Sequence, residues 1–324
     1  MSFTARNSTP VNNDMNKTTD SSSAKVFLAT IICHVFWGFS FLASKQAQGV
    51  AHIFVLLSHR FLIAFILMSL LIPLRIAKLS LRGKGKRALL LIVLGIAEPV
   101  VYFFGEQYGI LHSNTIFSGV MIAMIPVVST VAAAPILGER PTVGQLIFSL
   151  ISVGGVIGIG LMSKSSGSLD WIGVAALAVA VISATVYSLL SRRLSAEFSA
   201  FERTYMMMGV GAVVFTVLGW ITAGSAVEYF KPFAQPTYTL SIAFLSVCCS
   251  VISYFLGSYA IGKMSVARVT VFANLTTAVS VFAGAVFLRE PFSWLGLVFC
   301  LLILLGIYGV QRTARKDEKG GNRT

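Results

Sequence analysis

Charged residues are scarce in this chain. Only 11% of the 324 residues are Asp, Glu, Lys or Arg, and 56% are hydrophobic. A soluble domain carries about a quarter charged residues. Acidic residues are the rarer sign, with 12 against 25 basic residues. This composition cannot cover a surface that faces water, so a soluble globular fold is excluded.

Cysteine is also rare, and its spacing matches no metal site or redox pair. All four cysteines (Cys33, Cys248, Cys249 and Cys300) fall inside apolar runs. Adjacent cysteines such as Cys248 and Cys249 rarely bridge, so we interpret all four as small apolar packing residues. Walker and glycine-rich phosphate motifs are missing, which excludes ATP hydrolysis by this chain alone. No cofactor and no metal site are predicted.

The chain does contain many continuous apolar runs of about 20 residues, each long enough to cross about 30 Å of hydrocarbon as a helix. Continuous runs favour helices over the alternating pattern of a membrane β-barrel. The sequence therefore predicts an all-α membrane protein with ten transmembrane helices. Their expected ranges are 26–46, 53–73, 88–108, 113–137, 142–162, 171–191, 203–223, 238–260, 266–288 and 293–311.

The distribution of basic residues predicts the orientation of these helices. With a cytoplasmic N-terminus, twenty of the 25 Lys and Arg residues fall in the tails and cytoplasmic loops, against four on the other side. The remaining basic residue, Arg60, lies within the second apolar run. Since Lys and Arg concentrate on the cytoplasmic side, we expect both termini there and the protein in the cell inner membrane. The positive charge is then a topology signal, and no nucleic-acid partner is predicted.

The chain also repeats itself at an offset of 151 positions. Tyr108, Leu137, Glu139 and Gly155 fall on residues of the same type, and the pair Phe103-Phe104 falls on Tyr254-Phe255. Each unit would hold five helices, an odd number, so the two copies must lie upside down relative to one another. That is the inverted-repeat architecture of secondary transporters, with a site near the midplane. A membrane protein that duplicated for packing alone is the alternative.

Four segments follow from these observations. Residues 1–25 are predicted to be a disordered cytoplasmic tail because they are rich in Ser, Thr and Asn and lack an apolar period. Residues 26–162 form the first five-helix repeat and residues 170–311 the second. Residues 312–324 form a basic cytoplasmic tail.

The chain resembles the drug/metabolite transporter superfamily, in particular its ten-helix EamA-type members. The resemblance rests on Trp37-Gly38, on Arg60, on the stretch from Tyr108 to Gly155 with its Glu139-Arg140-Pro141-Thr142 turn, and on the Arg289-Glu290-Pro291 turn of the second copy. The second copy departs from the pattern because it lacks an Arg after its glutamate and a Trp in its first helix. The resemblance implies ten helices, both ends cytoplasmic, and export or exchange of small metabolites, amino acids among them, through a central cavity.

Ionisable groups within a bilayer are costly and are functional candidates by default. Arg60 lies about 10 Å and Glu98 about 13 Å below the outer surface, at 1.5 Å of helix rise per residue. An Arg60–Glu98 ion pair with a structural role is one interpretation. The alternative is that Glu98 binds a proton or a substrate amine. Pro99 directly follows and removes a backbone donor, which favours a functional break in the helix.

Other polar and aromatic residues accompany these two. Tyr102, one turn from Glu98, could orient its carboxylate. His34 is either a helix-packing residue or a proton carrier, and Trp37 either stacks on a substrate or packs. The set of substrate-binding or coupling candidates is Glu98, His34, Trp37, Tyr102, Arg60, Asn274, Ser253, Tyr254 and Tyr187.

These residues predict a secondary active transporter that exports or exchanges small metabolites, with amino acids or related compounds favoured. Its expected partners are a small-molecule substrate, protons and the lipid bilayer, and it is expected to be a monomer or homodimer. The first alternative is a proton-coupled multidrug or cation exporter, and the second is a non-transporting membrane sensor or scaffold. A membrane enzyme would need a nucleophile–base or metal cluster, and no such spacing occurs in the sequence.

Overall fold

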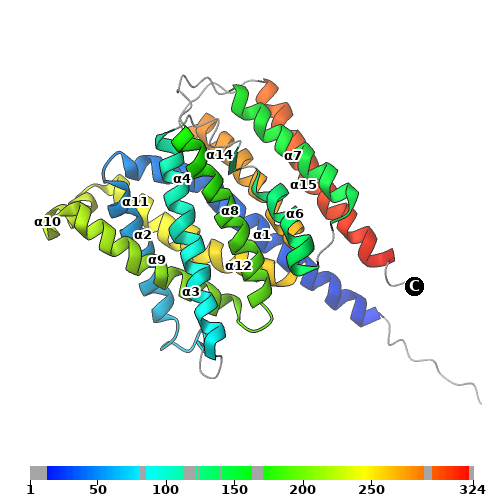
Figure 1. Ribbon diagram of the computed structural model, residues 1–324, viewed down its shortest axis with the longest axis horizontal. Helices are drawn as coiled ribbons and strands as arrows, with labels where there is room; N and C mark the ends of the chain where they lie inside the picture. The colour runs from blue at the N-terminus through cyan, green and yellow to red at the C-terminus, as the bar shows by residue number, and fades with distance from the viewer. Residues whose placement is uncertain are drawn as a thin grey trace, which may run out of the picture.

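The computed structural model describes residues 13–80, 85–112, 121–122, 124–138, 141–162, 171–287 and 294–320. Within these ranges the regular secondary structure is entirely helical (Figure 1). The first half contains α1 (Asn13–Gln48), α2 (Ile53–Leu70), η1 (Gly85–Ala88), α3 (Leu89–Gly95), η2 (Ile96–Val101), α4 (Tyr102–Leu111), α6 (Ile125–Leu137) and α7 (Val143–Met162). The second half contains α8 (Trp171–Leu194), α9 (Ala200–Ala223), α10 (Ala226–Phe230), η3 (Lys231–Ala234), α11 (Pro236–Phe244), η4 (Leu245–Ile252), α12 (Ser253–Lys263), α13 (Val266–Thr270), α14 (Ala273–Phe287) and α15 (Trp294–Gly320).

Six stretches of the described residues are long and apolar enough to cross a membrane. They are Ala24–Gln48, Ile53–Leu70, Leu89–Gly109, Trp171–Leu194, Ala200–Ala223 and Pro236–Lys263. Ile125–Leu137, Val143–Gly155 and Trp294–Val310 are shorter apolar helices. The chain is thus a multi-pass helical membrane protein, and the exact count of ten spans stays a prediction.

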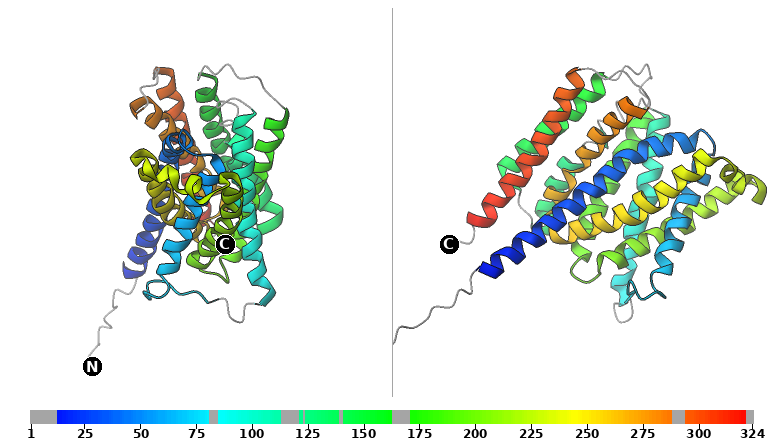
Figure 2. Two further views of the ribbon diagram at one scale, coloured as in Figure 1. Left: turned by 90° about the vertical axis from the view of Figure 1, so that its left-hand side faces the viewer. Right: turned by 180° about the vertical axis from the view of Figure 1, so that it is seen from behind.

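The two ends of the chain differ in part from expectation. Residues 13–25, predicted to be disordered, form the first turns of α1, because a long apolar helix can extend into flanking polar residues that do not break it. At the other end α15 continues through basic residues to Gly320. The start of α1 and the end of α15 lie on one side of the bundle (Figure 2). We call this side the terminal side and the opposite one the far side.

The two halves pack against each other reciprocally. Helix α2 packs on α9, α4 packs on α8, and α12 packs on α1. The broken segments do likewise, since η2 contacts α9 and η4 contacts α2. Helices α2 and α9 are the second helices of their repeats, and the third helix of each repeat contacts the first helix of the other. These are the contacts expected of two similar units related by a two-fold rotation.

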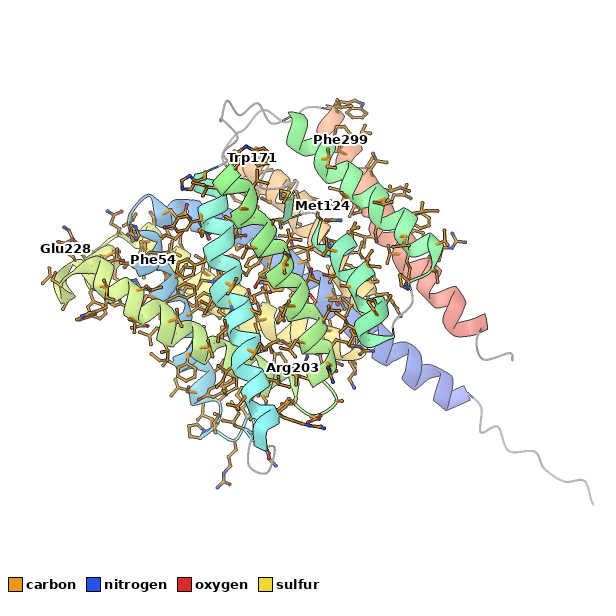
Figure 3. The ribbon with its side chains drawn as sticks, in the orientation of Figure 1. Phe54, Met124, Trp171, Arg203, Glu228 and Phe299 are labelled. Carbon is orange, nitrogen blue, oxygen red and sulfur yellow. The ribbon has the colours of Figure 1, made fainter. Side chains whose placement is uncertain are left out.

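Helices α7 and α15 show the same symmetry at the level of single residues. A Cβ added to Gly155 would lie 2.8 Å from the Phe299 carbonyl oxygen, and one added to Gly306 would lie 2.7 Å from that of Phe148. Each glycine and each phenylalanine is related to the other by the offset of 151 positions. The two helices run antiparallel, and Phe299 lies at their contact (Figures 1 and 3). Gly155 and Gly306 therefore permit the close approach of these two helices.

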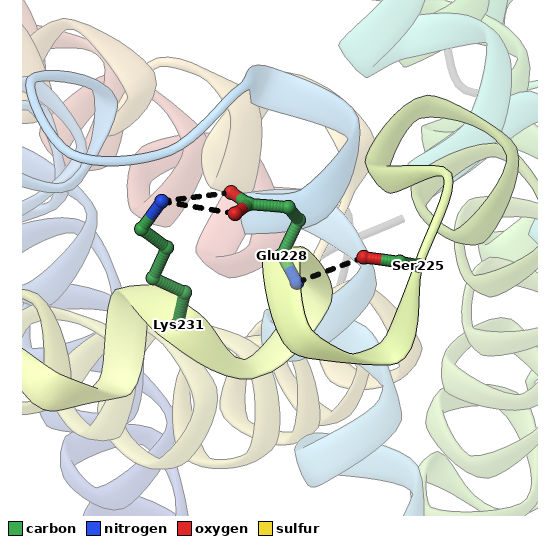
Figure 4. A network of polar contacts seen from close by, with 3 residues as sticks. All are labelled: Ser225, Glu228 and Lys231. Carbon is green, nitrogen blue, oxygen red and sulfur yellow. Dashed lines mark hydrogen bonds and ion pairs between the residues drawn. The ribbon is translucent and has the colours of Figure 1, made fainter.

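The far side also carries a small exposed segment, α10 and η3. Ser225 caps α10 by accepting the Glu228 amide at 3.2 Å, and Lys231 Nζ lies 2.9 Å from Glu228 Oε1 (Figure 4). An exposed ion pair of this kind adds little stability. Glu228 is therefore an exposed reference carboxylate, in contrast to the buried glutamates of the bundle.

Candidate functional site

Three ionisable side chains are buried in the middle of the bundle. Arg60 on α2 is 3% exposed, Glu98 in η2 is 7% exposed, and Glu106 on α4 is 6% exposed. The helices around them come from both repeats, since α2 packs against η4 and α4 packs against α8. Charges held inside a membrane-spanning bundle are rare and usually functional. We call these three residues the charged cluster.

The helix that carries Glu98 is broken at that residue. Glu98 has non-helical angles, φ −139° and ψ 120°, between α3 and α4. Pro99 explains a break here, because it has no N–H to donate and its ring clashes with the preceding turn. The Ser183 hydroxyl on α8 donates to the Ala97 carbonyl at 2.6 Å, which satisfies one backbone group at the break. The predicted interruption at Pro99 therefore exists and places Glu98 inside the bundle.

Glu98 is held by a tyrosine of the other repeat. The Tyr254 hydroxyl on α12 donates to Glu98 Oε1 at 2.8 Å. Within the described part of the chain, no protein group binds the second oxygen, Oε2. A buried carboxylate normally uses several hydrogen bonds. The free oxygen of Glu98 thus remains as an acceptor for a proton or for a cationic group of a ligand.

Arg60 is not ion-paired with Glu98. Its Nε donates to Ser250 Oγ at 2.8 Å, and its guanidinium carbon lies 4.9 Å from the centroid of the Phe103 ring and 5.4 Å from that of Phe61. Contact with ring faces stabilises a buried guanidinium without neutralising it. In the described part of the chain Nη1 and Nη2 have no protein acceptor. The structural interpretation, a direct Arg60–Glu98 pair, is therefore wrong for this conformation.

Trp37 and His34 on α1 lie beside the cluster and are held by backbone groups. Trp37 Nε1 donates to the Cys249 carbonyl at 3.1 Å, and its ring meets the Tyr254 ring edge-on at 5.1 Å between centroids. His34 Nδ1 lies 2.8 Å from the Thr30 carbonyl, so this nitrogen carries the hydrogen, and the ring packs on Trp37 at 5.1 Å. The contacts of His34 agree with the packing interpretation. Trp37 positions Tyr254, which in turn holds Glu98.

Tyr102 does not orient Glu98 as expected. Its hydroxyl donates to Glu106 Oε1 at 2.9 Å, one turn toward the far side. Spacing of i to i+4 connects Tyr102 to both glutamates equally, and the sequence could not choose between them. Glu106, eight residues beyond Glu98 in the sequence, is as buried as Glu98. It is the main functional candidate missing from the predicted set.

The remaining predicted residues lie farther from the charged cluster or are bound locally. The Tyr187 hydroxyl pairs with Ser258 Oγ at 3.4 Å, while its ring contacts that of Tyr254 at 6.4 Å. Ser253 donates to the carbonyl of Cys248 at 2.8 Å, five residues earlier in its own helix. Asn274 donates to Ser152 Oγ on α7 at 2.9 Å, and its Oδ1 has no partner. Asn274 therefore joins α14 to α7 and lies apart from Glu98.

A second buried arginine was not predicted. Arg203, at the start of α9, is 2% exposed and donates to the Ser191 carbonyl at 2.6 Å and to the Ser258 carbonyl at 2.5 Å (Figure 3). It therefore connects α8, α9 and α12 on the terminal side. Sequence alone does not reveal this role, because a basic residue at a helix start is also typical of the cytoplasmic ends of membrane spans. Glu139 and Glu290, whose turns carry the family resemblance, lie outside the described residues.

A bundle of two reciprocally packed repeats, with buried opposite charges where they meet, is the arrangement of a membrane transporter. The EamA-like transporter family model matches residues 24–161 and 171–312. The chain belongs to this family of transporters, and the match to two successive segments agrees with the two repeats.

Similar proteins agree with this assignment. The chain is 31% identical to the uncharacterized transporter YcxC of Bacillus subtilis (strain 168), over 90% of this chain and 95% of that protein. It is 26% identical to a probable terminal-alkyne amino-acid exporter of Streptantibioticus cattleyicolor, over 89% of this chain and 94% of that protein. One crystal structure matches with a TM-score of 0.74 and 18% identity, over 91% of this chain and 99% of that one, and shows the fold alone.

Proposed function

We propose that this protein is a secondary active transporter that exports or exchanges small metabolites, with amino acids or related compounds as the favoured substrates. It works by alternating access in the cell inner membrane, with both termini in the cytoplasm. The observation that carries the proposal is the charged cluster, in which Arg60 and Glu98 are buried where the repeats meet and are bound by neutral groups rather than by each other.

The unpaired polar atoms of the charged cluster suit the carboxylate and ammonium groups of an amino acid. Arg60 offers Nη1 and Nη2, which suit the two oxygens of a carboxylate. Glu98 offers Oε2 to an ammonium group or to a proton. The relative from Streptantibioticus cattleyicolor, whose printed name is that of an amino-acid exporter, supports the same substrate class. A ligand with both charges would neutralise both groups at once, which lowers the cost of burying them.

The test is transport by purified protein in proteoliposomes, with a panel of radiolabelled amino acids and fluorescent cationic dyes, each with and without an imposed pH gradient. We expect at least one amino acid to be carried, and its flux to respond to the gradient or to unlabelled amino acid on the opposite side. Empty liposomes supply the baseline. Flux at that baseline for every amino acid contradicts the proposal.

A second candidate is a proton-coupled exporter of multiple drugs or cations. It is favoured by the aromatic rings around Tyr254, the partner of Glu98, since Tyr254 meets the rings of Trp37 and Tyr187 edge-on and ring faces attract cations. Transport of the dyes without any amino acid identifies this function. Absence of flux for the whole panel, with binding retained, identifies the sensor or scaffold.

A further inference from the structure

Two carboxyl groups, rather than one, face the centre of this bundle. Glu98 and Glu106 are eight residues apart, with Tyr102 midway between them in the sequence. Tyr102 and Glu106 lie one turn apart on α4, and Glu98 lies at the break that precedes this helix. Both glutamates are more than nine-tenths buried. Each accepts a tyrosine hydroxyl on its Oε1, from Tyr254 at 2.8 Å for Glu98 and from Tyr102 at 2.9 Å for Glu106. The proposed function above uses only the first of them.

The charges around the pair do not balance if both carboxyls are ionised. Arg60 on α2 is the cation that acts electrostatically on both glutamates, and the charge of Glu106 acts on Glu98. The other titratable groups that face Glu98 are neutral at pH 7. They are Cys33 on α1, Tyr102 on α4, Tyr187 on α8 and Tyr254 on α12. Arg203 is on the terminal side and bound to Ser191 and Ser258.

One guanidinium therefore faces two buried carboxyls. An uncompensated charge in a low-dielectric interior is expensive, and interacting carboxyls protonate as a pair rather than one by one. Arginine stays charged under all relevant conditions. The lowest-cost state of the empty site holds one proton between Glu98 and Glu106, which leaves one negative charge opposite Arg60.

The second carboxyl also has a polar connection to the far side. Glu106 Oε2 accepts Gln107 Nε2 at 3.3 Å, and Gln107 Oε1 accepts Gln48 Nε2 at 3.1 Å. Gln48 is the last residue of α1 and is exposed. No such chain of side chains is needed to pack a helix end. Glu106 thus lies between the buried Glu98 and polar groups that reach the surface.

We propose that Glu98 and Glu106 form a coupled pair that holds a single exchangeable proton, and that Glu106 is the member that exchanges it with the far side. This inference rests on the proposed function for its purpose, because a shared proton is what the transporter would exchange for substrate. Binding of a cationic group at Glu98 displaces the proton toward Glu106, and its release to the far side then leaves the two carboxylates facing two cations.

The test uses dicyclohexylcarbodiimide, which reacts with protonated carboxyls in apolar surroundings, on the full-length protein in lipid nanodiscs at pH 7. Mass spectrometry of the peptides measures the labelled fraction at each glutamate. Glu98→Gln should lower the labelling of Glu106 about tenfold, which is one pKa unit of coupling, because one carboxylate then suffices to balance Arg60. Glu106→Gln should lower the labelling of Glu98 likewise. Glu228→Gln, at the exposed reference carboxylate, should change neither.

A second variant should change the labelling in the opposite direction. A general loss of folding cannot lower the labelling in one variant and raise it in the other. Arg60→Gln removes the cation, so both glutamates should be protonated and their labelling should rise. Unchanged labelling in Glu98→Gln, or no rise in Arg60→Gln, overturns the coupled pair. In the wild-type protein, which needs no variant to fold, both glutamates should lose labelling in the same two steps as pH rises. A single step at each glutamate, with a different midpoint for each, overturns the coupled pair as well.

A water-soluble carbodiimide tests which of the two glutamates is accessible from the far side. It should label Glu106 and leave Glu98 largely unmodified, and equal labelling of both contradicts the path to the far side. None of these measurements needs a substrate. Coupled labelling without any transport would therefore reject the proposed function and keep the proton pair, whereas transport with independent labelling would do the reverse.

Discussion

The two π-helical segments, η2 and η4, occupy equivalent positions in the two repeats but differ in chemistry. At an offset of 151 positions, Cys249, Ser253 and Gly257 stand where the first copy has Glu98, Tyr102 and Glu106. Both segments contain π-helical turns, η2 in one copy and η4 in the other, but non-helical angles occur in η2 alone of these two, at Glu98. The copies therefore share the π-helical turns, while the sharp break and the charge are confined to the first.

The uncharged copy supplies partners for the charged one. Tyr254 donates to Glu98, Ser250 accepts from Arg60, and the Cys249 carbonyl accepts from Trp37. These three bonds all cross between the repeats. A rocking motion of one repeat against the other must change them, which is how access to the site and the state of its charges can be connected. The first repeat thus carries the ionisable groups of the cluster, and the second repeat holds them in position.

The largest effect is expected from Glu98→Gln, which removes the charge and leaves the shape. Transport driven by a pH gradient should decrease about 100-fold, a typical loss for a group that transfers a proton. Exchange of substrate without a gradient should be less affected. The measurement is initial flux in proteoliposomes, with Glu228→Gln as the exposed control. A variant with the pH dependence of the wild type would show that the proton site lies elsewhere.

The next effect concerns α7 and α15, where the two repeats make equivalent contacts residue by residue. Gly155→Ala and Gly306→Ala should each destabilise the protein by about 1–3 kcal/mol, because the added methyl group meets a backbone carbonyl below 3 Å. Gly154→Ala is the matched control, since a Cβ there meets nothing within 4 Å. The apparent Tm of purified protein measures the difference. Equal Tm values for all three variants would refute the close contact between α7 and α15.

A smaller effect is expected from Tyr254→Phe, which removes the hydroxyl that the neutral copy donates to Glu98. A hydrogen bond to a charged group contributes about 1.5–3 kcal/mol, so coupled transport should fall roughly tenfold. Tyr308→Phe, at a tyrosine that is 60% exposed, serves as control. If Tyr254→Phe transports as the wild type does, Glu98 does not depend on the second repeat for its position.

The smallest effect is expected from Ser250→Ala. The loss of the acceptor for Arg60 Nε should weaken substrate binding about threefold, because the two ring contacts of the guanidinium remain. The concentration for half-maximal flux should rise while the maximal rate stays near that of the wild type.

Ser199→Ala, at the cap of α9, is unsuitable as a control because it alters folding. Ser80→Ala is suitable, since Ser80 uses only its backbone N–H, toward Glu202. A changed maximal rate would mean that Ser250 acts on the transport cycle and not on binding.

Much of the fold could be predicted because apolar run length and repeat offset are local properties of the sequence. The spans of α2, α8 and α9 and the break at Pro99 follow from them directly. The depths of Arg60 and Glu98 in the membrane followed from helix rise. Depth, however, says nothing about rotation around the helix axis, which is why the predicted pair is replaced by bonds to Ser250 and Tyr254.

The residues that sequence reasoning missed have a common cause. Glu106 lies eight residues beyond Glu98, toward the end of its helix, and the packing of α4 against α8 buries it. Arg203 lies at a helix start, where basic residues ordinarily signal topology, and only the tertiary structure shows that it connects three helices. Burial of a helix end depends on which neighbour covers it, and the covering helices come from the other repeat.

The reciprocal contact of α7 and α15 has a consequence for the ancestry of the chain. Gly155 contacts Phe299 and Gly306 contacts Phe148, the relation in which residue i of one partner meets j of the other and j meets i. That is the mark of an interface between two identical subunits. A half-length ancestor inserted in both orientations would form it as a homodimer. Such a dimer would have to carry Glu98 twice, whereas fusion into one chain allowed the acid to persist in one half and its neutral partners to evolve in the other.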